Sequence, residues 1–124
     1  MAVQLTITFK GTHLHVQVSG VREYRDRLDS WRQVVNACEA YQCFNILGES
    51  DPNIRPLETM EAHDTYKVLK EAGVTRKYRI AWVVHNPANL EPMLFTETVL
   101  KNRTFTGARV FTDATSAKQW LLNT

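Results

Sequence analysis

The chain opens with two segments in which apolar and polar residues alternate. The first covers residues 3–10 and the second covers residues 13–18, with Gly11 and Thr12 between them. Alternation at this period is typical of a β-strand with one buried face. Because only a short turn separates the two strands, we predict an antiparallel hairpin.

Residues 23–41 change to a helical period. Their apolar members recur every three or four residues, at Tyr24, Leu28, Trp31, Val34, Val35, Cys38 and Tyr41. Such a stripe predicts a long helix with one face against the sheet. We expect a short strand over residues 43–47, which Gly48 ends, and then a polar loop over residues 49–56.

Pro56 suits the first turn of the next helix, and Gly73 suits its end. The apolar run of residues 80–84 follows, with the sequence Ile-Ala-Trp-Val-Val. A run this short and this apolar predicts a strand that is buried on both faces. Asn86 and Pro87 then begin a helix, residues 106–111 form the last strand, and Asp113 caps the final helix.

A strand buried on both faces needs helices on both sides of its sheet, which makes the fold class α/β. We therefore predict one domain over residues 1–124. It consists of an opening β-hairpin followed by alternating helices and strands, with a mixed, mostly parallel five-stranded sheet and four helices.

Composition narrows the possible partners. The 124 residues carry a formal net charge of +2, which is too small to indicate binding to nucleic acid or to an anionic membrane. The two cysteines, Cys38 and Cys43, lack metal-binding spacing and suit a reducing compartment. With neither a signal peptide nor a membrane-length apolar segment, we expect a cytoplasmic protein without a metal, a cofactor or an integral membrane segment.

Two segments carry a resemblance to a known family. One is Arg-Ile-Ala at residues 79–81, within the central strand, and the other is Arg-Val-Phe at residues 109–111, which leads into a helix ending in Trp120-Leu121. Together with the order of elements, they resemble the STAS domain superfamily, and most closely its bacterial SpoIIAA-like group. The likeness covers the whole chain in element order and is strong only from Tyr78 onward.

The resemblance implies a small non-enzymatic regulatory or binding domain. It would act through protein–protein contact or through a bound apolar small molecule. In phospho-regulated STAS proteins a serine stands after the second core strand, and Ser50 lies near that place, although the second serine and the glycine of that motif are absent. We also expect a homodimer, with Leu94-Phe95 and the loop around Ile54 as candidate contacts.

Ligands of open α/β sheets bind beyond the carboxyl ends of the strands. Those ends supply six candidate residues for ligand or partner binding: Glu49, Ser50, Asp51, His85, Asn86 and Asp113. A histidine among carboxylates offers a second reading, a small hydrolase-like or isomerase-like enzyme that uses His85 with a strand-end acid. The simpler alternative is that these polar residues only cap helices.

Three other groups of residues each allow a functional and a structural reading. Six apolar and aromatic residues either line an apolar pocket between the helices and the sheet or simply pack in the core: Tyr24, Trp31, Met60, Tyr66, Met93 and Phe95. His13 and His15 share one face of a strand, as a metal pair or as exposed residues. The basic residues at 76, 77, 79, 101 and 103 indicate an anion patch or a solvated face.

Overall fold

The structure is a computed structural model that describes residues 3–20, 23–53 and 55–123. The strands within these ranges are β1 (Gln4–Phe9), β2 (Leu14–Ser19), β3 (Asn45–Ser50), β4 (Arg79–Val83) and β5 (Ala108–Phe111). The helices are α1 (Tyr24–Tyr41), α2 (Thr59–Ala72), α3 (Leu90–Asn102) and α4 (Ala114–Leu122), with a short 3-10 turn, η1, at Pro87–Asn89.

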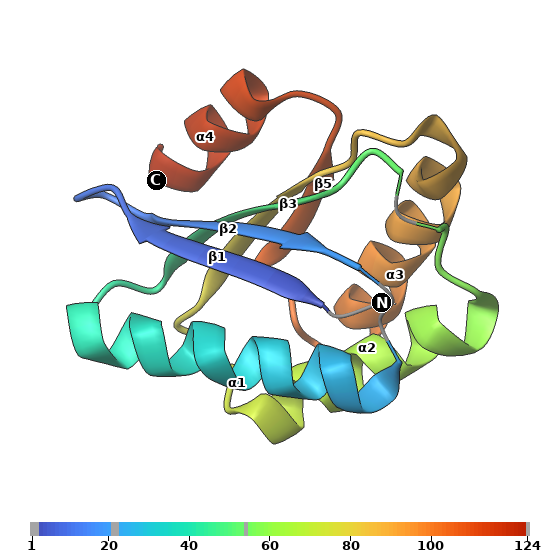
Figure 1. Cartoon of the computed structure of the whole chain (residues 1–124), viewed down its shortest axis with the longest axis horizontal. Helices are drawn as coiled ribbons and strands as arrows, with labels where there is room; N and C mark the ends of the chain where they lie inside the picture. The colour runs from blue at the N-terminus through green and yellow to red at the C-terminus, as the bar shows by residue number, and fades with distance from the viewer. Residues whose placement is uncertain (1–2, 21–22, 54, 124) are drawn as a thin grey trace.

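The strands form one sheet in the order β1-β2-β3-β4-β5. The β1–β2 pair is antiparallel and the other pairs are parallel. Figure 1 shows α1, α2 and α3 on one face of this sheet and α4 on the opposite face. The predicted fold class is therefore confirmed: an α/β protein that opens with a hairpin and continues with alternating helices and strands.

Strand β4 is buried on both faces, as the apolar run predicted. Ile80 and Trp82 pack with α1, α2 and α3 in the larger hydrophobic core. Ala81 and Val83 pack beneath α4 in a smaller core that includes Leu121. Each face of the strand thus has its own helical layer, and β4 pairs on both sides with parallel neighbours.

The prediction that Gly48 ends the third strand is wrong. Gly48 lies inside β3, opposite Val16 on one side and Trp82 on the other. A Cβ atom at this position would overlap the six-membered ring of Trp82. Glycine is therefore present to make room for an aromatic neighbour, and the strand continues through Glu49 to Ser50.

The start of the second helix also differs from the prediction, because Pro56 lies before the helix. Helix α2 begins at Thr59, where the carboxylate of Glu61 accepts a hydrogen bond from the backbone N–H of Glu58 at 2.9 Å. Glu58 and Glu61 form a reciprocal capping box, which sets the start of the helix. The predicted end at Gly73 is confirmed by its left-handed backbone, with φ of 104°.

Some apolar residues predicted to face inward are exposed. Tyr41 is 53% exposed and stacks on Phe9, with ring centroids 4.5 Å apart.

Leu94 and Phe95, the proposed dimer contacts, are 43% and 40% exposed. Ile54, the other proposed contact, lies outside the described residues. In the described part of the chain, no helix combines the length and the apolar character needed to cross a membrane.

The close approach of Gly48 to Trp82 predicts a large effect from a small substitution. Gly48→Ala should lower the free energy of unfolding by about 1–3 kcal/mol, since the added methyl group must displace the indole ring. Urea denaturation measures this cost. In a Trp82→Leu background the same change should cost much less, and an equal cost in both backgrounds would show that the ring contact is not its cause.

Candidate functional site

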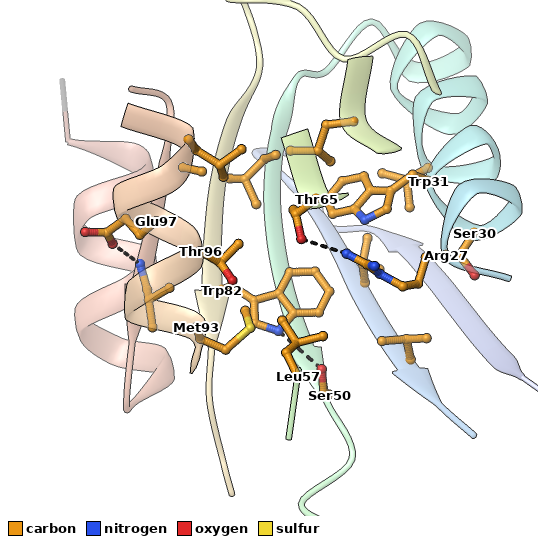
Figure 2. Close-up of a pocket in the computed structure, with 18 of the residues that line it drawn as sticks. Arg27, Ser30, Trp31, Ser50, Leu57, Thr65, Trp82, Met93, Thr96 and Glu97 are labelled. Carbon is orange, nitrogen blue, oxygen red and sulfur yellow. Dashed lines mark hydrogen bonds between the residues drawn. The ribbon is translucent and has the colours of Figure 1, made fainter. Parts of the chain in front are cut away.

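A cavity of about 100 Å³ lies between the sheet and the helices α1, α2 and α3. The sheet side of its wall includes Val16, Val18, Ile80, Trp82 and Ala108, and the helix side includes Arg27, Trp31, Val34, Leu69, Met93, Thr96 and Leu100. Figure 2 shows the two indole rings and the methionine converging on the open space. The wall is mostly apolar, with a few polar groups placed among the hydrocarbon surfaces.

Trp82 has a fixed position on the floor of this cavity. Its ring lies over the bare backbone of Gly48, and its indole N–H donates a hydrogen bond to the hydroxyl of Ser50 at 3.2 Å. The ring of Trp31 on α1 is tilted toward it, with centroids 6.0 Å apart. Both indoles remain partly exposed, although Trp82 belongs to a strand in the interior of the sheet.

Arg27 brings a positive charge to the same cavity. It comes from α1 and is only 7% exposed. Its guanidinium donates to the hydroxyl of Thr65 at 2.6 Å and to the backbone carbonyl of Glu61 at 3.1 Å, both on α2. Burial, the largest influence, lowers the pKa of Arg27 below its ordinary value, against the attraction of Glu61 and Asp64. Sequence reasoning missed this residue, yet its place on the apolar stripe, four residues before Trp31, was a readable signal.

A second, polar hollow lies on the opposite face of the sheet, over β1, β2 and β3. Its wall is formed by Gln4, Thr6, Gln17, Val18, Ser19, Glu49, Ser50, Asp51, Pro52 and His85. Helix α4 packs mainly on β4, β3 and β5, and none of the residues described around the hollow belongs to it. The carboxyl end of β3 therefore contributes to both the cavity and the hollow.

Glu49 joins two histidines across this polar face. Its carboxylate lies 2.5 Å from Nε2 of His15 and 2.7 Å from Nε2 of His85. The strand register explains the arrangement: Glu49 is paired with Gln17 in β2 and with Val83 in β4. His15 precedes Gln17 by two residues and His85 follows Val83 by two, so the three side chains form a diagonal across three strands.

The hydrogen bonds of this diagonal, formed by His15, Glu49 and His85, determine its protonation. Burial by itself raises the pKa of Glu49, but the hydrogen bonds and charges of His15 and His85 outweigh burial and hold the pKa below its ordinary value. An ionised carboxylate only accepts hydrogen bonds, so each Nε2 must carry the proton. The Nδ1 atom of a neutral His85, whose side chain is 35% exposed, is then the available proton acceptor.

The other predicted site residues take no part in the contacts between Glu49 and the two histidines. Ser50 is 7% exposed and its hydroxyl is bonded to Trp82, so phosphorylation there stays a prediction of the sequence alone. Asp51 accepts from the backbone N–H of Asn53 at 2.8 Å and borders the hollow. Asn86 and Asp113 accept backbone hydrogen bonds at the starts of η1 and α4, which is the capping role that sequence reasoning offered as the alternative.

The two histidines at the start of the second strand, His13 just before β2 and His15 within it, have different surroundings. His15 belongs to the Glu49 diagonal, which the sequence did not indicate, because strand register decides which side chains meet. His13 is 4% exposed, and burial, followed by the charge of Lys118 on α4, lowers its pKa below the ordinary value. Neither is the exposed strand residue of the simpler reading. Among the residues that the structure describes, no cluster of His, Cys, Asp and Glu is arranged to hold a metal ion.

Two of the six residues proposed for an apolar pocket, Trp31 and Met93, lie in the cavity wall. Met60 and Phe95 are exposed on α2 and α3 instead.

The basic residues at 76, 77, 79, 101 and 103 include two that contact neighbouring side chains, as expected for a solvated face. Lys77 lies 3.6 Å from the carboxylate of Glu39, and the guanidinium of Arg79 lies over the ring of Trp120 at 4.2 Å.

Comparison with known proteins adds no assignment. No protein-family model matches the sequence, and a search of curated proteins finds no significant match. The likeness to STAS domains therefore rests on the order of elements and on the two segments in β4 and β5.

The lowered pKa of Glu49 predicts a pH-dependent contribution to stability. Because the pKa is lower in the folded state, this contribution is complete above the ordinary carboxyl value of about 4.3 and is lost as the pH falls through the folded value. Glu49→Gln should cost about 1–2 kcal/mol at pH 7, where two charge-assisted hydrogen bonds are weakened. Urea denaturation between pH 7 and pH 3 should show the difference from wild type shrinking.

A matched control is Glu71→Gln, which alters an exposed pair with Lys67 on α2. Its cost should be small at every pH, as for other surface ion pairs. A cost of Glu49→Gln that does not change with pH would contradict the assignment of the charge to the diagonal.

Proposed function

We propose that this protein is a small non-enzymatic binding domain of the STAS/SpoIIAA-like type, which holds an apolar small molecule between its sheet and α1, α2 and α3. The observation that carries the proposal is the cavity over the ring of Trp82, at a place where the space between sheet and helices would ordinarily be packed. Its wall has the character of a ligand site, namely apolar and aromatic surface with a few polar groups.

Three features of the wall support a ligand rather than a packing defect. The ring of Trp82 is held in place from two sides, by Gly48 beneath it and by Ser50 at its N–H. Met93 supplies an adaptable side chain at the edge. The cavity also lies toward the carboxyl ends of the parallel strands, where α/β sheets bind their ligands.

The size of the cavity indicates the size of the occupant. An engineered apolar cavity of about 150 Å³ in another protein binds benzene. The volume here is about 100 Å³. The apolar body of the ligand is thus on the scale of one aromatic ring or a short alkyl chain.

Filling the cavity should abolish uptake. Ala108 on β5 lines the cavity, whereas Ala114 at the start of α4 is exposed and lies outside it. In Ala108→Leu, the affinity for benzene or indole, measured by shifts of the Trp82 indole N–H in ¹⁵N–¹H spectra, should fall at least about tenfold. Ala114→Leu should bind as wild type does. Equal binding by both variants would place the site elsewhere.

The distance between His85 and Glu49 favours a second candidate function, an acid–base enzyme. Nε2 of His85 lies 2.7 Å from the carboxylate, within the range expected of a catalytic pair, and both side chains border the polar hollow. In this reading Glu49 orients the imidazole and Nδ1 accepts a proton from a water molecule or from a substrate in the hollow. Hydrolysis or isomerisation is the class of reaction that such a base serves.

Turnover of p-nitrophenyl acetate and butyrate tests this alternative. If His85 is the base, His85→Asn should reduce kcat at least about 100-fold, as loss of a general base does. His63→Asn is the control, since His63 is exposed on α2 and packs on Phe95. Wild-type rates no higher than those of His85→Asn would remove the enzyme from consideration and leave the binding domain.

We extend the proposal to a cytoplasmic homodimer, as expected from the cysteine usage and from the apolar residues that the fold leaves on the surface. The exposed side chains of Met60 on α2 and of Leu94 and Phe95 on α3 offer an apolar surface for such a contact. His63 adds to the same surface, with its ring 5.2 Å from that of Phe95.

A further inference from the structure

Arg27 is a buried cation without an acidic partner. Its two described acceptors, a backbone carbonyl and a threonine hydroxyl, are neutral. Within residues 3–20, 23–53 and 55–123, no carboxylate forms an ion pair with it. A buried charge is costly unless an opposite charge and hydrogen bonds compensate for it. The charge of Arg27 is therefore only partly compensated in the ligand-free protein.

Glu61 attracts Arg27 more strongly than Asp64 does, but its carboxylate is held by another residue, and Asp64 forms no ion pair with Arg27 among the described residues. The carboxylate of Glu61 is held by both terminal nitrogens of Arg55, at 2.6 and 2.7 Å. This bidentate contact lowers the pKa of Glu61 and keeps its charge directed at Arg55. Its third bond is to the backbone N–H of Glu58, in the capping box of α2. Glu61 therefore offers Arg27 its backbone carbonyl but not its carboxylate.

Glu97, the acid in the cavity wall, is committed too. It accepts the backbone N–H of Val110 at 2.7 Å and pairs with Lys101 at 3.1 Å. Figure 2 shows it on the far side of the cavity from Arg27. Arg109 also borders the cavity, but its guanidinium lies over the ring of Phe111, which belongs to the core beneath α4. Arg27 is thus the cation that faces an occupant.

We propose that the ligand of this cavity is a small monocarboxylate, with its carboxylate on the guanidinium of Arg27 and its apolar body between Trp31 and Trp82. This inference rests on the proposed function and names the ligand's chemical class. A carboxylate matches the planar fork of a guanidinium and supplies the missing negative charge. The rest of the wall is largely apolar, and the guanidinium of the other arginine in it, Arg109, lies over the ring of Phe111. A monoanion with a hydrocarbon body therefore fits this cavity better than a phosphate dianion does.

The contacts of Thr65 separate this role from a purely structural one. The hydroxyl of Thr65 also donates to the carbonyl of Glu61 at 2.9 Å, so both acceptors keep a partner if Arg27 is replaced. Arg27→Met preserves most of the side-chain length and removes the uncompensated charge. The ligand-free variant should therefore unfold at the same or a higher urea concentration than wild type, whereas a residue needed to join α1 to α2 would show the reverse.

The decisive experiment compares matched probes on a Trp120→Phe chain, which keeps every residue of the wild-type cavity. Hexanoate is paired with hexan-1-ol and benzoate with benzyl alcohol, at pH 7 and fixed ionic strength. The Trp120→Phe change removes the indole of α4, which lies on the other face of the sheet. Titrations then follow the fluorescence of Trp31 and Trp82 together with the Trp82 indole N–H signal.

We expect each carboxylate to bind about 10- to 100-fold more tightly than its alcohol, as charge-assisted hydrogen bonds provide. In Arg27→Met this preference should disappear while the alcohols keep their affinity to within about threefold. Arg27→Lys should retain part of the preference, since it keeps the charge without the fork.

The outcomes distinguish the two proposals. Equal affinity of carboxylate and alcohol for the wild-type cavity would overturn the carboxylate and leave the apolar site standing. Failure of all four probes to bind would overturn the proposed function itself. Both results come from the wild-type cavity, so neither depends on whether a variant at position 27 folds.

Discussion

The parallel register of β3 between β2 and β4 is the constraint on which both sites depend. Gly48 is opposite Trp82, and Glu49 is opposite Val83. Successive residues of a strand point to opposite faces, so a shift of one residue would exchange those faces. Glu49 would then enter the apolar cavity, and Gly48 would no longer make room for the indole ring. The cavity and the histidine diagonal therefore exist only in the observed register.

This register makes β3 a boundary between two chemistries. Ser50 and Gly48 face the cavity, where they fix the ring of Trp82. Glu49, between them, faces the opposite side and binds two histidines. Ser50 and Val18 border both openings, so the apolar and polar sites adjoin at the carboxyl ends of β2 and β3. A ligand that moves the ring of Trp82 would change its hydrogen bond to the hydroxyl of Ser50, the residue next to Glu49.

The sequence alone predicts the architecture because the fold depends on local periods. The alternation in β2, the helical stripe of α1 and the apolar run of β4 each indicate one element, and the glycine after α2 marks its end. What the sequence does not reveal depends on contacts between distant residues. Gly48 makes room for Trp82 only because of the strand pairing. In a sequence, glycine more often indicates a turn or the end of a strand or helix.

The candidate site was predictable to the same partial extent. Glu49 lies near the end of β3 and His85 follows β4, its parallel neighbour, so their convergence at one rim follows from topology. His15 joins them only through register, which the residue pattern does not specify. Arg27 was visible in the sequence as a charge on an apolar stripe, but its significance depends on Arg55 having already paired with Glu61. That competition is a property of the folded chain.

The departures from ordinary packing occur together at one place. They are a cavity in the interior, a central-strand tryptophan that is partly exposed, a glycine within a strand, and an arginine on the buried face of a helix. Each of them lowers stability when taken alone. The opposite core, where Ala81, Val83 and Leu121 pack beneath α4, shows none of them among its described members. Natural chains tolerate such local costs at functional sites, where a ligand offsets them. An apolar carboxylate would fill the cavity, cover the indole and neutralise the arginine, and so would compensate for three of the four departures in a single binding event.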